Sequence, residues 1–402
     1  VIGNSSRINV KELDIYTKHR DISLNAKGSI YLNESRNHNI DLNLHDATIT
    51  NEGWEFIEEK LPYLHAMIPS EVVRIGHITA QGNLRSNSTQ GNITLDIDSD
   101  AGTIQARANI DNKGYYTTHI TGKDINIAKA IPTSPLTRTD IILQAEGTIT
   151  DMQSLLSGKQ GLTIPTGTFK GMATQTILMG YEYKNIQLNG AYSPHIYSGK
   201  IAIDDPNGQL NLQARYDESQ LQPQYTAQIV ADSINLHALN LIDIHEGRSF
   251  SARLNGNIKG KQFNHMTGSI KIDSLTMHRE GDDYSINSIA LYSFESETKT
   301  LSLNSDFMNA AVKGDFTYQT IMRSLLAHLH DYLPSLCPSH NHRHITSSNQ
   351  CLVDLQIKDT EPLKELLLIP ISIDKTASIV AQFYDESRSV GLDIQIPQLT
   401  YN

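Results

Sequence analysis

The sequence predicts a mostly β protein in which amphipathic strands follow one another with only a few short helical inserts. Three observations support this prediction: strand-sized runs of alternating apolar and polar residues, scarce helical periodicity, and a glycine-marked strand unit that recurs along the chain. Strands and helices do not alternate as a parallel β/α fold requires. Because only 39% of the residues are apolar and 6% are aromatic, we expect an extended architecture with much wet surface rather than one large dry core.

The alternation is clearest in the run GNITLDIDSDAGTIQARANI at 91–110. Apolar and polar residues alternate on both sides of a turn at 98–102, and the apolar positions are Ile93, Leu95, Ile97, Ile104, Ala106, Ala108 and Ile110. Because successive side chains of a strand point to opposite faces, this run predicts a β-hairpin with one apolar and one wet face. The same pattern returns in LSLNSDF, GSIKID and GLDIQI, so strands are expected to fill most of the chain.

Helical spacing is confined to three segments, near 52–67, 318–333 and 361–368. The first places Trp54, Ile57 and two leucines on one helical face, and the proline at position 62 breaks or kinks it. The second segment stops at a proline, and the third is shorter. Each segment predicts a short helical insert between strands.

An internal repeat runs through the predicted strands. Six seven-residue units, beginning with LNAKGSI and ITAQGNL, share one pattern, and their glycines are Gly28, Gly82, Gly147, Gly190, Gly256 and Gly314. Gly82 and Gly190 are 108 residues apart, and the pentapeptide TIQAR returns as NLQAR with the same offset. The spacing predicts approximate repeats at 82–189 and 190–298, within a single elongated segment that spans 1–402.

In each unit the glycine shares a strand face with the apolar positions, so these six residues are predicted to be inner-face glycines. A glycine inside a strand marks a bend, or a close approach by another backbone or by a ligand. Bending of a curved sheet is the simpler of these alternatives.

The charge pattern and the missing motifs exclude several classes of protein. The formal net charge is −11 with both signs interspersed, which argues against nucleic-acid binding. No nucleophile elbow, P-loop, HExxH or EF-hand motif is present, so we predict neither an enzyme nor a cofactor. No run of 18 apolar residues occurs. Because the chain begins at Val1 and ends after a strand-like run, we expect it to be a piece of a longer protein.

The loop CPSHNHRHITSSNQC contains both cysteines of the chain, Cys337 and Cys351, and three alternating histidines, His340, His342 and His344. Thiolate and imidazole are ligands that zinc prefers, but the CxxC pair of the usual zinc sites is absent. A disulfide would close the loop and contribute about 2–3 kcal/mol in an oxidising compartment. A solvated polar connection is the third alternative.

The long tracts of amphipathic strands, the glycine-marked units and the occasional helical inserts resemble the AsmA-like superfamily, and within it the TamB-type translocation and assembly module proteins. The run DSINLHALNLI followed by FSARLNGNIKG is similar to that family's succession of a strand, a short polar link and a new glycine-marked strand. The segment 361–402 is similar to another such unit. The resemblance covers nearly the whole chain.

This resemblance implies a long twisted sheet curled into an open U-shaped trough, apolar inside and polar outside. It also implies a periplasmic segment of an inner-membrane-anchored protein that bridges the inner and outer membranes for phospholipid transport and outer-membrane biogenesis. The implied partners are phospholipid acyl chains, both membranes and an outer-membrane barrel protein. An oxidising periplasm favours the disulfide over the zinc site.

The predicted lining of such a lipid groove is Ile93, Leu95, Ile97, Ile104, Ala106, Ile110, Leu210, Leu212, Ala214, Ile270, Ile272, Leu301 and Leu303. Glycines on the same face would leave width for acyl chains to pass. The alternative is that these residues fill the core of an ordinary sandwich or solenoid.

Two other functions remain open. One is a scaffold whose exposed strand edges pair with client strands. The other is an enzyme or carbohydrate-binding solenoid, which needs aromatic platforms or paired carboxylates along one face.

Overall fold

The computed structural model describes residues 2–4, 7–32, 38–87, 89–149, 165–243, 246–279, 281–321, 323–324, 327, 348–359, 364, 371–373, 375–387 and 389–401. The chain divides into two compact units, Val1–Pro206 and Asn207–Asn402, which we call unit 1 and unit 2. Each unit is built on an open antiparallel sheet with few helices, so the protein is mostly β, as the alternation predicts. The single elongated segment over 1–402 stays a prediction.

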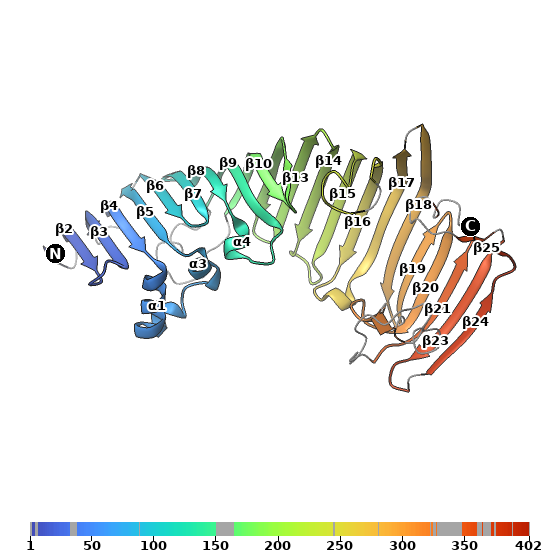
Figure 1. Ribbon diagram of the computed structural model, residues 1–402. Helices are drawn as coiled ribbons and strands as arrows, with labels where there is room; N and C mark the ends of the chain where they lie inside the picture. The colour runs from blue at the N-terminus through green and yellow to red at the C-terminus, as the bar shows by residue number, and fades with distance from the viewer. Residues whose placement is uncertain are drawn as a thin grey trace. The chain divides into compact units, whose positions relative to one another are not determined.

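In unit 1 the strands lie side by side in chain order, and neighbouring strands are antiparallel (Figure 1). They are β1 (Ile2–Asn4), β2 (Arg7–Tyr16), β3 (Ile22–Leu32), β4 (His38–Ile49), β5 (Ile78–Asn87), β6 (Gln90–Ser99), β7 (Gly102–Asp111), β8 (Tyr115–Ile125), β9 (Leu136–Thr148), β10 (Thr166–Leu178), β11 (Tyr181–Tyr183), β12 (Ile186–Ser193) and β13 (Ile196–Asp205). The short β11 pairs with one end of β10, and β12 pairs with the rest of it. Among the described residues, no pairing joins the first strand of unit 1 to its last, so this sheet is not a closed barrel.

Short helices stand at one end of the strands of unit 1 (Figure 1). They are α1 (Asn51–Lys60), α2 (Pro62–His65), α3 (Ser70–Ile75) and α4 (Ile127–Ala130). Thr50 caps α1, because its hydroxyl accepts a hydrogen bond from the backbone N–H of Gly53 at 3.2 Å. The indole N–H of Trp54 donates to the carbonyl of Gly76 at 2.7 Å, which fastens α1 to the end of α3. The first predicted helical insert thus coincides with α1 and α2, and α2 begins at Pro62.

Unit 2 also contains an open antiparallel sheet. Its sheet contains β14 (Gly208–Asp217), β15 (Gln224–Ile234), β16 (Ser249–Lys259), β17 (Thr267–Arg279), β18 (Asp282–Glu295), β19 (Lys299–Ser305), β20 (Met308–Asp315), β21 (Gln350–Ile357), β23 (Ala377–Tyr384) and β24 (Ser389–Gln395). β22 (Ile371–Ile373) and β25 (Leu399–Tyr401) form a separate antiparallel pair. A 3₁₀ turn, Phe263–His265, lies in the connection between β16 and β17.

The second and third predicted helical inserts fall only partly within the described residues. The residues described there as helical are Ile321, Arg323, Ser324, Ala327 and Lys364. Residues 328–333, and every position of 361–368 except Lys364, lie outside the described part of the chain.

Two matching irregularities agree with the internal repeat. β8 and β15 each contain a bulge near their end, with Asp124 (φ 55°) and Ser233 (φ 51°) in the left-handed region. Two residues further on, the backbone N–H of Asn126 donates at 2.8 Å to the carbonyl just before β7, and that of Asn235 donates at 2.8 Å to the carbonyl just before β14. The two predicted repeats therefore share a bulge and a backbone hydrogen bond at corresponding positions, in addition to their sequence pattern.

Candidate apolar groove

One face of the unit 1 sheet is apolar because the pairing register aligns the apolar positions of successive strands. The central row is Leu13, Ala26, Leu44, Gly82, Leu95, Ala106, Ile120, Leu143, Gly171, Leu188 and Ile201. The next row toward the helices is Ile15, Leu24, Ala47, Ala80, Ile97, Ile104, Gly122, Ile141, Ala173, Ile186 and Ile203. A slip of one residue would turn each side chain to the other face, so the register makes this surface continuous.

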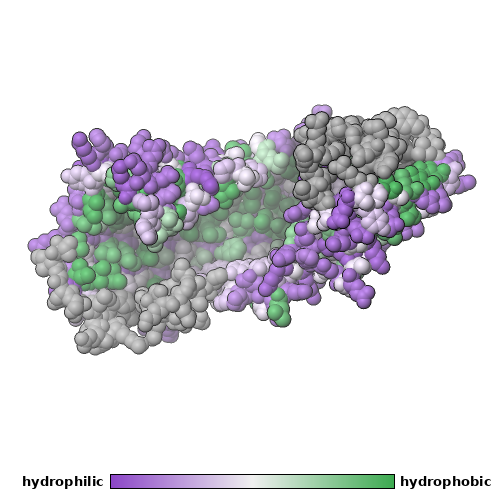
Figure 2. Space-filling model, turned by 90° about the horizontal axis from the view of Figure 1, so that it is seen from below, coloured by the Kyte–Doolittle hydropathy of each residue, from purple (hydrophilic) through white to green (hydrophobic). Residues whose placement is uncertain are grey.

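No second layer buries the apolar face of unit 1 within the described residues. The buried apolar side chains there are Trp54, Ile57, Ala101, Ala173 and Tyr183. By contrast, every residue of the central row is only half-buried, and Ile93 is 47% exposed. A sandwich would cover these rows with a facing sheet. Figure 2 instead shows a hollowed apolar band over the strands of unit 1, between polar margins. The face is the inside of an open trough.

The predicted inner-face glycines lie on the apolar faces of the two sheets, and all but Gly314, which pairs with Lys299 and Cys351, have an apolar or aromatic residue as a cross-strand neighbour. At Gly82 an added Cβ would lie 2.2 Å from the carbonyl oxygen of Thr94 on β6. A backbone oxygen of the adjacent strand would lie similarly close, at 2.1–2.3 Å, at Gly28, Gly147, Gly190 and Gly314. At Gly256 the nearest atom is 3.9 Å away. Close backbone approach thus explains five of these six glycines.

Unit 2 has the same kind of face. Its central row is Ala214, Ala227, Gly256, Ile270, Leu291, Leu303, Ala310, Leu355, Ile379 and Ile394. A cavity of about 270 Å³ opens on this face, lined by Ile258, Phe263, Met266, Thr267, Gly268, Ser269, Ile270, Leu291, Ser293, Leu301 and Tyr318. The sheet supplies its floor, and the β16–β17 connection and Tyr318 supply its walls. Its volume is close to the lower limit for ligand pockets, about 300 Å³.

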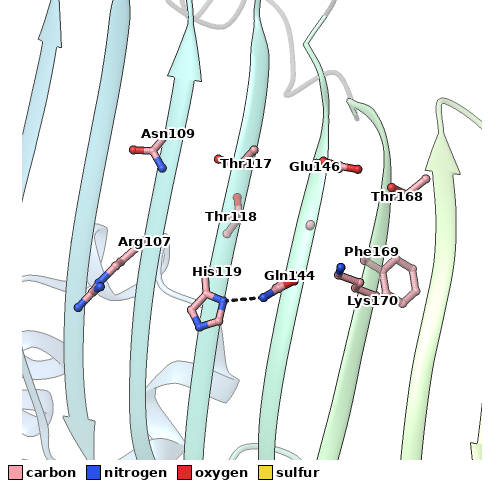
Figure 3. A pocket seen from close by; sticks show the side chains of 11 residues that line it. Arg107, Asn109, Thr117, Thr118, His119, Gln144, Glu146, Thr168, Phe169 and Lys170 are labelled. Atoms are coloured by element: carbon pink, nitrogen blue, oxygen red, sulfur yellow. Dashed lines mark hydrogen bonds between the residues drawn. The ribbon is translucent and has the colours of Figure 1, made fainter.

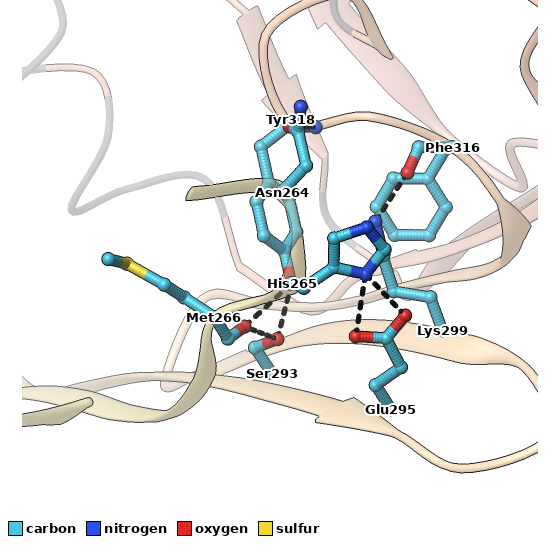
Figure 4. Close-up of polar contacts among 8 residues, drawn as sticks. All are labelled: Asn264, His265, Met266, Ser293, Glu295, Lys299, Phe316 and Tyr318. Carbon is cyan, nitrogen blue, oxygen red and sulfur yellow. Dashed lines mark hydrogen bonds and ion pairs between the residues drawn. The ribbon is translucent and has the colours of Figure 1, made fainter. Parts of the chain in front are cut away.

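Polar contacts close one end of this cavity (Figure 4). The hydroxyls of Tyr318 and Ser293 both donate to the carbonyl of Met266, at 3.1 and 2.8 Å. Asn264 accepts a hydrogen bond from the backbone N–H of Tyr318 at 3.1 Å. These bonds hold the ring of Tyr318 against the apolar floor.

Lys299 is buried beside this cluster, with 7% of its surface exposed. Its amine donates to the carbonyl of Phe316 at 2.6 Å, and it lies 5.2 and 4.9 Å from the ring centroids of Phe316 and Tyr318. Among the described residues its partners are therefore a carbonyl and two aromatic faces. Sequence reasoning missed this site, because a lysine at the start of a predicted strand gives no indication of burial.

The segment that follows β20 returns over the apolar face of unit 2. Phe316 is 1% exposed and packs with Cys351 and Phe383, and partly buried Leu301, Val312 and Val353 lie against this cluster. Asn349, 2% exposed, fastens the segment: its Oδ1 accepts from the N–H of Thr317 at 3.0 Å, and its Nδ2 donates to Asp385 at 2.9 Å. Part of this face is therefore covered, unlike the trough of unit 1.

The opposite face of unit 1 is polar and has a hollow of its own (Figure 3). About 470 Å³ in volume, it is lined chiefly by Arg107, His119, Gln144, Glu146 and Lys170, from β7 to β10. The amide of Gln144 lies 3.5 Å from Nδ1 of His119. These residues are the polar half of the alternation. Their exposed, mixed charges match a solvated outer surface better than a catalytic centre.

All thirteen predicted lining positions lie on the apolar faces. Six belong to unit 1, on β6 and β7, and seven to unit 2, on β14, β17 and β19. Eleven of them are half-buried, whereas Ile93 and Ala214 are exposed. The alternation therefore predicted which strand face is apolar, and the role of these residues as a lipid lining stays a prediction. The residues that close the unit 2 cavity, Phe263 and Tyr318, were missed because they lie outside the regular strands.

The histidine-rich loop gives no site within the described residues. Cys337 and the three histidines lie outside them, and Cys351, buried on β21, has no disulfide partner among the described residues. Burial, and secondarily the charge of Asp385, raise the pKa of the Cys351 thiol to about 12. Its pairing with Cys337 stays a prediction. No group of three or more potential metal ligands occurs in the described part of the chain.

Comparison with known proteins identifies no relative: no family model, no curated protein and no solved structure matches the chain. None of the helices within the described residues is long and apolar enough to cross a membrane. The candidate site therefore depends on its own geometry: an open, half-buried apolar trough in unit 1 and an apolar cavity in unit 2.

Proposed function

We propose that the chain is a periplasmic segment of an AsmA-like, TamB-type protein that shields lipid acyl chains in an apolar trough. In this proposal the parent protein bridges the inner and outer membranes for phospholipid transport and outer-membrane biogenesis. The observation that supports it is the uncovered apolar face of unit 1, on which every residue of the central row is half-buried. The role is non-enzymatic and needs no cofactor.

The free energies involved make such a surface useful. A two-chain phospholipid that leaves a bilayer exposes roughly 30 methylenes to water, at about 0.8 kcal/mol each. The total is over roughly 20 kcal/mol, which is too large for unaided desorption. A row of aliphatic side chains can cover the acyl chains while the head group stays in water. This requires no reactive residue, only an unbroken apolar face such as the row from Leu13 to Ile201.

A scaffold for outer-membrane protein assembly is the second candidate. β24 pairs with β23 on one side, and within the described residues its other edge has no partner strand. Leu392 and Ile394 on β24 are 43% and 47% exposed. An open edge with exposed apolar side chains can accept a client strand. Lipid that co-purifies without a client protein favours the trough over this alternative.

The direct test is native mass spectrometry of the protein purified from membrane-containing extracts. We expect bound phospholipid on the unmodified chain. Replacing Leu95 and Leu212 by aspartate puts charges on the apolar faces of β6 and β14, and desolvating them disfavours acyl chains. The double variant L95D/L212D is expected to lose most of the bound lipid.

Thr94→Asp and Gln213→Asp make the matched control, because they add the same charges on the same strands but on the polar face. Circular dichroism checks that both double variants remain folded. If L95D/L212D keeps as much lipid as the control, acyl chains do not lie on these faces and the proposal fails.

A further inference from the structure

An aromatic platform lies on the apolar face of unit 1, at the strand ends opposite the helices. Tyr116 on β8 and Tyr192 on β12 reach toward each other across β9 and β10, and their hydroxyls are hydrogen-bonded. Below them are Gly147 and Gly167, at which an added Cβ would lie 2.8 Å from the Tyr116 hydroxyl. Glycine at both positions thus leaves the space that the tyrosines occupy.

Phe169 extends this platform toward the centre of the face. Its ring stacks on that of Tyr192 with centroids 6.4 Å apart and 26° between the ring planes. An added Cβ at Gly190 would lie 2.6 Å from the Phe169 ring. Two of the predicted inner-face glycines, Gly147 and Gly190, therefore serve to seat aromatic rings.

The tyrosine pair retains one hydrogen-bond donor. Each phenol has one O–H, and in the pair one hydroxyl donates to the other. The second hydrogen has no further acceptor within the described residues. Both side chains are half-buried, and burial, followed by the hydrogen bond with Tyr192, raises the pKa of Tyr116. The pair is thus a neutral donor on an otherwise apolar surface.

The position of the tyrosine pair on the apolar face suits the region of an amphiphilic ligand where its apolar and polar parts meet. From the row of the tyrosines to the row of Ile97 and Ile104, six residues along each strand provide roughly 20 Å of mainly apolar surface. The helices stand beyond the far end of these strands. Tyrosine suits a boundary at which one end of a ligand is apolar and the other is wet.

We propose that Tyr116, Phe169 and Tyr192 form the subsite for the polar–apolar junction of a bound diacyl lipid. The remaining O–H donates to an ester carbonyl of the lipid, the acyl chains run over the aliphatic rows toward the helices, and the head group faces solvent. This rests on the proposed function and adds to it an orientation and a preference for ester over ether linkages.

The test compares two lipids with the same head group and chains, dioleoyl phosphatidylethanolamine and its dialkyl ether analogue, presented in the same mixed micelles. The ether analogue lacks the carbonyl acceptors. One hydrogen bond corresponds to about a 2- to 10-fold difference in affinity, so the unmodified chain is expected to prefer the ester by that factor. Y116F/Y192F keeps both rings and is expected to bind the two lipids equally.

Tyr115→Phe is the matched control, because Tyr115 precedes Tyr116 but donates to Glu146 on the polar face at 2.7 Å; it should keep the preference. If the unmodified chain binds both lipids equally, or Y116F/Y192F keeps the preference, the subsite is wrong and the lipid groove stands. If the unmodified chain binds neither lipid, the proposed function fails as well.

Discussion

At the scale of single residues, the sequence pattern predicted that the repeated glycines lie on the apolar face of the sheet. The structure shows why a side chain is excluded at most of these positions. Gly82 and Gly256 occupy equivalent positions in the glycine-marked units, and both lie on an apolar face. Only Gly82 is closely approached by a neighbouring backbone oxygen. The sequence pattern cannot separate the two cases, because the distance to the neighbouring strand is set in the folded sheet and not by the local sequence.

This difference gives a paired prediction. Gly82→Ala forces a methyl group against the carbonyl of Thr94, which cannot move without disturbing the β5–β6 ladder, and overpacking of this kind costs about 1–3 kcal/mol. Gly256→Ala has room and restricts the unfolded chain, so it is expected to be neutral or to stabilise by about 0.4–1 kcal/mol. Urea denaturation of the two variants measures both changes. Equal destabilisation would show that close approach is not the reason for Gly82.

The sequence predicts the residues of the apolar rows, but it does not predict the contacts around Lys299. A period of two places Leu95 and Ala106 on one face from local information alone. Lys299, Phe316 and Tyr318 meet only because the chain after β20 returns over β18 and β19. No local pattern encodes that contact, so the burial of Lys299 could not be predicted.

At the scale of elements, one buried side chain makes several of the contacts that fasten the returning segment after β20. Besides Thr317 and Asp385, Asn349 contacts Thr320, to which its Nδ2 donates at 3.1 Å. Its own backbone N–H donates to Asp385 at 2.9 Å. A single asparagine thus joins the returning segment to the ends of β21 and β23.

Asn349→Ala is expected to free this segment while leaving the strands in place. Unpairing its buried partners costs about 1–3 kcal/mol, so local opening becomes more frequent. Hydrogen exchange at 316–321 is expected to accelerate, with little change in β16 and β17. Asn304→Ala, at an exposed position on β19, is the control and should leave exchange unchanged. Unaltered exchange in the Asn349 variant would mean that the packing of Phe316 and the hydrogen bonds of Tyr318 hold the segment without Asn349.

At the scale of the whole molecule, the paired strands of each sheet are neighbours in the chain or nearly so. The sequence predicted this mostly β, repeat-built organisation, because the alternation and the glycine units recur throughout the chain. The sequence could not predict whether a second layer covers the apolar face, since strands with the same alternation of apolar and polar residues occur in sandwiches and in open troughs. The half-buried central row of unit 1 decides between them.

A sheet of this kind should unfold locally. The free energy of unfolding is then close to a sum of contributions from single strands and from pairs of neighbouring strands. A destabilising substitution in one strand therefore affects mainly the two strands that pair with it. Leu143→Ala in β9 removes a half-buried leucine, at a cost of about 2 kcal/mol, the lower end of the usual range. We expect faster hydrogen exchange in β8, β9 and β10 and unchanged exchange in β2 and β3, because among the described residues β2 and β3 pair only with each other, β1 and β4. Uniform acceleration across unit 1 would instead indicate a single cooperative core, which is the behaviour of a sandwich and not of an open trough.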